Sequence, residues 1–283
     1  MGFGDFLYNN FNSERRRKRE QVRREAKELR QEAKEILQDA KDLYDDYKDL
    51  RGDARQLVNE LNNSIRDHNN YKSDLLRELG SEVASTIENF KRFNINSRII
   101  NAPNIGENSM PNISLVSLAF SSMPGGNFNP INFLLSSLSD PYEDRTKADK
   151  QRDDAEEYFY KVQDAYNELR DTTERLRNTN RFIDDERQML EQLMNKVRKI
   201  MAQLKNAMNR TAHTQTEAKY MNAVCHIAEK IKMSLEQQIT DNCGGIQSSY
   251  KNCIQQLKKI TESIPNQPTI TDSSSWLDAL IRI

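Results

Sequence analysis

Apolar residues recur at alternating steps of four and three along the first part of the chain. This stripe extends over five heptads and consists of Val22, Ala26, Leu29, Ala33, Ile36, Ala40, Leu43, Tyr47, Leu50, Ala54 and Leu57. The intervening positions are mostly Glu, Lys, Arg, Gln and Asp, which suit a solvated face. The period is typical of coiled-coil packing and predicts a long coiled-coil helix over residues 14–93.

A second stripe follows Asp140 and Pro141, which suit the N-cap and the first helical position of a helix. No Gly or Pro interrupts residues 142–243, so this range predicts a second long helical arm. Two stretches within it, residues 178–181 and 210–216, are weak helix formers, and a bend or a hairpin turn is expected there. A fold-back helix is predicted within residues 244–264.

The segment between the two arms, residues 94–141, differs in kind. It is rich in Asn and Pro, and residues 113–138 carry no charge. Either short strands or short helices fit its two apolar runs. One interpretation is a small head that caps the coiled coil, and the other is an apolar tongue that enters a membrane or a partner. The candidate contact residues of this insert are Leu115, Val116, Leu118, Phe120, Phe133, Leu134 and Leu135.

Together these elements predict an all-α fold, an elongated antiparallel coiled coil or helical bundle with a small apolar head insert. The two arms would be joined at one end by residues 94–141. This layout resembles that of the α-helical pore-forming toxins, which carry an apolar tongue between long bundle helices. The resemblance lies in the arrangement of the elements and implies a membrane-active role for residues 113–138.

Composition supports an extended helical protein. Of the 283 residues, 30% are charged and 36% are hydrophobic, against roughly 45–50% apolar residues in typical globular domains. An elongated helical protein needs only a narrow apolar stripe, so a low share of hydrophobic residues and a high share of charged residues suit it. The net charge of −1 predicts neither nucleic-acid binding nor an acidic substrate.

The two ends of the chain carry further candidate contacts. Residues 1–13 form an aromatic-rich apolar segment, and residues 14–24 hold seven Lys or Arg and two Glu. The basic stretch is either the solvated start of a helix or a contact for an anionic surface, with lipid favoured over nucleic acid. The aromatic segment before it suits an interfacial anchor and equally suits an apolar end docked in the protein's own fold. Residues 265–283 read as a linker and an amphipathic segment that docks on the bundle or on a partner. The candidate contacts at the ends are Phe3, Phe6, Leu7, Arg15, Arg16, Arg17, Lys18, Arg19, Trp276, Leu277, Leu280 and Ile281.

No motif for nucleotide binding, hydrolysis or metal binding is present, so we assign no catalytic, cofactor-binding or metal-binding residue and expect no small-molecule substrate. Cys225, Cys243 and Cys253 lack the regular spacing of a zinc site, and Cys225 falls in an apolar register. No secretory signal or membrane-spanning run is visible, so a cytoplasmic protein, or one peripheral at a membrane, is expected. The sequence favours a non-enzymatic scaffold that self-associates or binds protein partners through the insert and the termini, with a pore-forming protein as the alternative.

Overall fold

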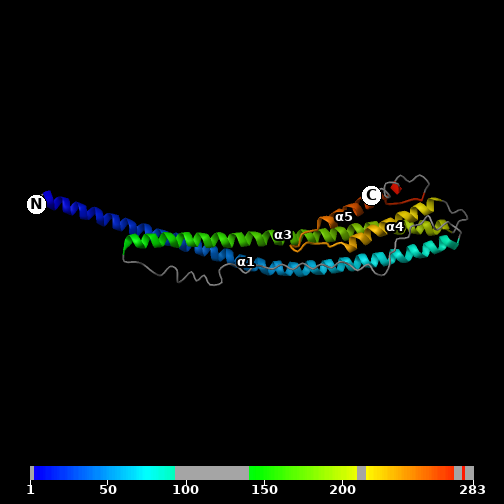
Figure 1. Ribbon diagram of the computed structural model, residues 1–283, viewed down its shortest axis with the longest axis horizontal. Helices are drawn as coiled ribbons and strands as arrows, with labels where there is room; N and C mark the ends of the chain where they lie inside the picture. Colours follow the sequence, from blue (N-terminus) through cyan, green and yellow to red (C-terminus); the bar gives the residue numbers. More distant parts are fainter. Residues whose placement is uncertain (1–2, 93–139, 209–214, 271–275, 278–283) are drawn as a thin grey trace. The chain divides into compact units, whose positions relative to one another are not determined.

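The computed structural model describes residues 3–92, 140–208, 215–270 and 276–277, and most of them are helical (Figure 1). The described helices are α1 (Phe3–Arg92), α3 (Pro141–Met208), α4 (Gln215–Glu236) and α5 (Ser248–Ser263). Within the described ranges no strand occurs, and the only extended pairing is an isolated antiparallel bridge between Thr240 and Ile246. The prediction of an all-helical fold is therefore confirmed for this part of the chain.

The chain divides into two compact units. Unit 1 comprises residues 1–55 and 119–173, and unit 2 comprises residues 56–118 and 174–283. The boundaries at residues 55/56 and 173/174 fall inside helices, so α1 and α3 each contribute their first part to unit 1 and their second part to unit 2.

In unit 1, α1 packs on α3 through a seam rich in alanine. Alternate positions of the stripe that runs from Val22 to Leu57 are mostly alanines, and Ala26, Ala33, Ala40 and Ala54 are all fully buried. The positions between them, which include Leu29, Ile36, Leu43 and Leu50, are half-buried. Fully buried alanines indicate that the two helix backbones approach closely, because no longer side chain separates them.

Contacts in unit 1 show that α1 and α3 run in the same direction. Glu25 pairs with Arg145 at 3.1 Å, near the start of α3. Further along both helices, Tyr47 and Ala54 pack with Leu169. Residue numbers thus increase together along the two helices.

The antiparallel arrangement predicted for the two arms is therefore wrong. A heptad stripe specifies which residues face a partner helix but does not by itself specify the direction of that partner. The connection through residues 93–140 is long enough for a crossover between parallel helices, as in bundles with long crossover connections. The insert lies outside the described residues, as do its candidate contacts from Leu115 to Leu135, so the head and tongue interpretations both stay predictions.

Unit 2 is a bundle in which α1, α3 and α5 run one way and α4 runs the other (Figure 1). Glu78 pairs with Arg198 at 2.8 Å and Glu82 with Lys205 at 3.5 Å, which continues the parallel pairing of α1 with α3. The reversal to α4 follows the end of α3 at Met208, next to the predicted weak stretch 210–216.

A tight loop joins α4 to α5. Backbone N–H groups of Cys243 and Gly245 both donate to the Asp241 carboxylate at 2.8 Å. Gly244 has a φ of 78°, a conformation that favours glycine, and its carbonyl accepts a hydrogen bond of 2.8 Å from Thr179. The other weak helix stretch, residues 178–181, thus lies inside α3, and its Thr179 holds this loop through the hydrogen bond to Gly244.

Candidate functional site

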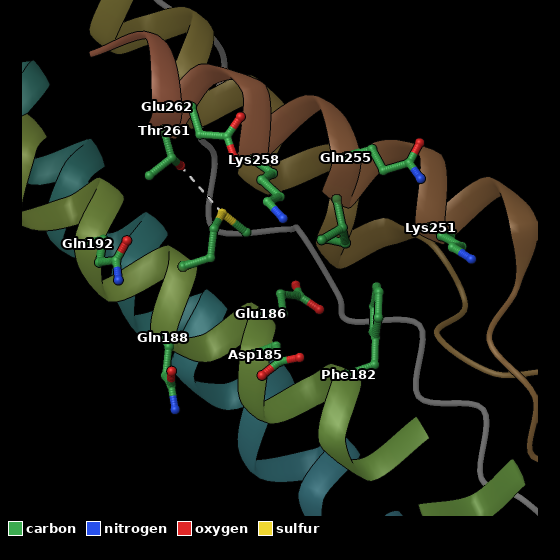
Figure 2. Close-up of a pocket in the computed structure, with 12 residues that line it drawn as sticks. Phe182, Asp185, Glu186, Gln188, Gln192, Lys251, Gln255, Lys258, Thr261 and Glu262 are labelled. Carbon is green, nitrogen blue, oxygen red and sulfur yellow. Dashed lines mark hydrogen bonds between the residues drawn. The ribbon is translucent and has the colours of Figure 1, made fainter. Parts of the chain in front are cut away.

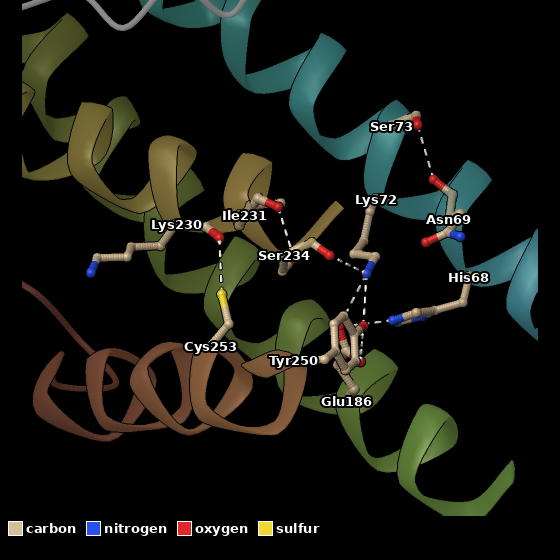
Figure 3. Close-up of polar contacts among 10 residues, drawn as sticks. All are labelled: His68, Asn69, Lys72, Ser73, Glu186, Lys230, Ile231, Ser234, Tyr250 and Cys253. Carbon is tan, nitrogen blue, oxygen red and sulfur yellow. Dashed lines mark hydrogen bonds and ion pairs between the residues drawn. The ribbon is translucent and has the colours of Figure 1, made fainter. Parts of the chain in front are cut away.

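Four titratable side chains meet in the core of unit 2, where α1, α3 and α5 come together (Figure 3). They are His68 and Lys72 from α1, Glu186 from α3 and Tyr250 from α5, and none keeps more than 2% of its surface exposed. We call these four residues the buried polar cluster.

The residues of the buried polar cluster are bonded chiefly to one another. Tyr250 donates its hydroxyl hydrogen to Glu186 Oε2 at 2.6 Å, and Lys72 Nζ donates to the Tyr250 oxygen at 2.7 Å. The Lys72 ammonium also lies 3.6 Å from Glu186 Oε1, and His68 Nε2 lies 2.9 Å from that same oxygen. Helix α4 contributes the Ser234 carbonyl, 3.4 Å from Lys72 Nζ. All four described helices therefore contribute to this network.

Burial and charge pull the pKa values of the cluster in different directions. Burial acts to raise the pKa of Glu186, but Lys72, His68 and Tyr250 together outweigh it and hold that pKa below its ordinary value. Burial lowers the pKa of Lys72, and the Glu186 carboxylate offsets part of this effect. Burial and the Glu186 charge both raise the pKa of Tyr250 well above its ordinary value. The cluster is thus built around an ionised Glu186.

This arrangement suits a structural role. Polar residues at core positions stabilise a helical bundle less than apolar residues would, but they restrict the register and direction in which helices can pair. Here the Glu186 carboxylate of α3 lies beside His68 and Lys72 of α1 and accepts a hydrogen bond from Tyr250 of α5. We infer that the cluster selects the parallel register of α1, α3 and α5.

An open groove of about 460 Å³ lies between α3 and α5 next to the cluster (Figure 2). Its apolar surface comes from Phe182, Met189 and Ile254. Phe182 packs edge-on against Tyr250 with ring centres 6.4 Å apart, so the groove and the buried polar cluster share a wall. We call this feature the α3–α5 groove.

The rim of the α3–α5 groove is polar and unevenly charged. On the α5 side it carries Lys251, Lys258 and Glu262, and on the α3 side Asp185 stands with two glutamines. Lys251 and Lys258 are exposed and lie seven residues apart, which is two helical turns along one side of the groove. The groove therefore combines an apolar floor with a pair of cations on one edge.

The residues predicted from sequence as contacts lie elsewhere. Arg15 to Arg19 are exposed on α1, and Phe3, Phe6 and Leu7 lie in its first turns. Trp276 packs edge-on against Tyr220 at 5.5 Å between ring centres, and Leu277 is buried in the core of unit 2. The last two contacts, Leu280 and Ile281, lie outside the described residues, as does the insert.

Sequence reasoning missed the buried polar cluster, although the register contained a signal for it. Steps of three and four from Ile65 lead to His68, Lys72, Leu75 and Leu79. A histidine and a lysine at successive core positions predict a buried partner of opposite charge. The three cysteines are free thiols, and no group of three metal-binding side chains occurs among the residues that the structure describes.

Comparisons of the chain with protein-family models, with curated proteins and with solved structures find no match. The function is therefore inferred from the geometry of the described residues and from the sequence.

Proposed function

We propose that this protein is a non-enzymatic helical scaffold that binds a helical segment of a partner protein in the α3–α5 groove. The insert and the termini would provide further contacts and a route to self-association. The observation that carries the proposal is the groove itself, an open groove of about 460 Å³ with an apolar floor and a polar rim on the face of two parallel helices.

A helix is the partner element that suits this surface. Two helices packed side by side leave a groove that accepts the apolar ridge of a third helix. The floor residues Phe182, Met189 and Ile254 would receive that ridge. Lys251 and Lys258 would face carboxylates spaced seven residues apart on the partner, and Asp185 would face a cation on its other side.

The buried polar cluster supports a scaffold over an enzyme. Its four side chains are at most 2% exposed, and Lys72, Tyr250 and Glu186 are joined by hydrogen bonds within the bundle. A catalytic group must reach a substrate, whereas these groups fix the positions of helices.

A photo-crosslinking side chain placed at Gln255, an exposed rim position, tests the groove in the native host cell. We expect a discrete adduct whose crosslinked peptide is an amphipathic helix with acidic residues on one edge. The same side chain at Asp67, exposed on α1 of the same unit, is the positional control.

Neighbouring lysines provide a matched test of charge. Lys258 lines the groove and Lys259 is exposed beside it without lining it. We expect Lys258→Glu to reduce the adduct at Gln255 by about tenfold, because it replaces an attraction with a repulsion, and Lys259→Glu to leave it unchanged. Equal effects of the two substitutions, or equal adducts at Gln255 and Asp67, would show that the groove is not the binding surface.

A membrane-active protein is the second candidate, favoured by the uncharged apolar stretch 113–138. Among the described helices, none has an apolar stretch suited to crossing a membrane. Replacing residues 113–138 with a Gly-Ser linker separates the two candidates. Loss of liposome leakage would favour membrane activity, whereas loss of an oligomer on size exclusion, without any leakage before or after, would favour assembly.

A further inference from the structure

The start of α1 contains an exposed stretch that precedes its described ion pairs with α3. The backbone is helical from Phe3 onward, and residues 14–21 are all exposed. Val22 is the first buried residue after them, and Glu25 then pairs with Arg145 of α3. This part of α1 therefore precedes its described pairing with α3.

The exposed stretch concentrates positive charge. Residues 15–19 are five consecutive Lys or Arg, and the wider range 14–24 contains seven basic and two acidic residues. Arg16 forms an exposed ion pair of 3.2 Å with Glu20, which neutralises a small share of this charge. Because successive residues of a helix are rotated by about 100°, five consecutive cations surround the helix with positive charge.

Apolar positions precede the basic ones on the same helix. In the sequence Phe3, Leu7 and Phe11 recur every four residues, with Phe6 between them, a spacing typical of an apolar row on one side of a helix. An apolar row followed directly by clustered cations is the pattern of a helix that lies at the interface of an anionic bilayer. Nucleic acid would use the cations but has no use for the apolar row.

We propose that residues 3–24 of α1 dock this protein peripherally on an anionic lipid bilayer. The apolar row enters the boundary between headgroups and acyl chains, and the cations lie against anionic headgroups. This surface belongs to unit 1 and the α3–α5 groove belongs to unit 2. The lipid-binding proposal is therefore independent of the proposed partner binding, and the two are tested separately.

Flotation of the full chain with vesicles tests the proposal. The probes are vesicles of phosphatidylcholine alone and vesicles with roughly a third phosphatidylserine, and we expect binding only to the latter. Replacing the five basic residues 15–19 with Gln should weaken binding at least about 100-fold, and raised salt should have the same effect. The matched control removes five positive charges from the paired part of the same helix, at Lys27, Lys34, Lys41, Lys48 and Arg55.

A variant in which Phe3, Leu7 and Phe11 are replaced with Ser should weaken binding about tenfold with little dependence on salt, because it removes apolar burial. Melting temperature is measured on every variant. The proposal is overturned if the chain binds both vesicles equally or neither, if the charge control weakens binding as much, or if the Ser variant lowers melting without lowering binding. Salt-sensitive binding to duplex DNA without vesicle binding would also overturn it.

Discussion

Lys72 and Glu186 lose their hydration together on folding and remain 3.6 Å apart in the core of unit 2. Each charge is tolerated there because the other is present. Substituting one of them leaves a buried charge without its partner. Substituting both removes the ion pair and leaves no unpaired charge in the core. The energetic role of this pair can therefore be isolated by comparing single and double variants.

We expect Lys72→Met and Glu186→Gln each to lower the free energy of unfolding by about 3–5 kcal/mol. The double variant should cost clearly less than the sum of the two, because the residues interact directly. Urea unfolding of the four proteins measures this. Additive costs would show that the pair has no coupling and that the cluster does not depend on charge.

Glu186 also predicts how stability depends on acid. Its pKa in the folded protein is held below the ordinary value of 4.5, so its ionisation stabilises the folded state. That contribution is complete above the ordinary pKa and is lost as the pH falls through the lower, folded-state pKa. The groups that face Glu186 are His68 and Lys72 from α1 and Tyr250 from α5, with the neutral Ser234 carbonyl of α4 nearby.

Unfolding free energies measured between about pH 6 and pH 3 should therefore fall more steeply for the native protein than for Glu186→Gln. The glutamine retains the size of the side chain and cannot titrate. Parallel pH profiles for the two proteins would assign the acid sensitivity to other carboxylates.

At the scale of elements, the seam of unit 1 depends on small residues. Ala33 and Ala155 are fully buried and pack with Leu37, Ile36 and Tyr158, so alanine on one helix accommodates a larger side chain nearby. Such size complementarity leaves little room for a larger residue at the alanine positions.

Replacing Ala40 with Leu should lower the free energy of unfolding by about 1–3 kcal/mol, because the fully buried site is overpacked. Lys41→Leu introduces the same side chain at the adjacent exposed position and should change stability by less than about 0.5 kcal/mol. Thermal or urea unfolding compares the two. A similar effect of both variants would mean that α1 does not meet α3 through this seam.

The sequence predicted the positions of the helices better than it predicted how the helices pack on one another. Long stripes identified α1 and α3 because periodicity is a local property, and the weak stretch 210–216 fell next to the end of α3 at Met208. The direction of α3 relative to α1 was not predictable, since it depends on contacts such as Glu25 with Arg145 that are 120 residues apart. The α3–α5 groove was likewise hidden, because Phe182 and Ile254 come from segments that the stripe analysis treated separately.

At the scale of the whole molecule, two units share two helices that run in the same direction. The chain passes from unit 2, where Glu82 of α1 lies beside Lys205, to unit 1, where α3 starts. The two proposed surfaces belong to different units, so variants of one leave the other intact. Together the two proposals assign partner binding to unit 2 and lipid binding to the start of unit 1.

Intramolecular crosslinking tests the parallel pairing most directly. In a variant with the three native cysteines replaced, we introduce cysteine pairs at Glu25 with Arg145 and at Glu82 with Lys205, whose side chains form ion pairs of 3.1 and 3.5 Å. Both pairs should crosslink within one chain through a short thiol reagent, and Glu25 paired with Asn206 should not. Crosslinking of Glu25 with Asn206, and failure of the two ion-pair positions, would instead indicate antiparallel arms and contradict the parallel arrangement.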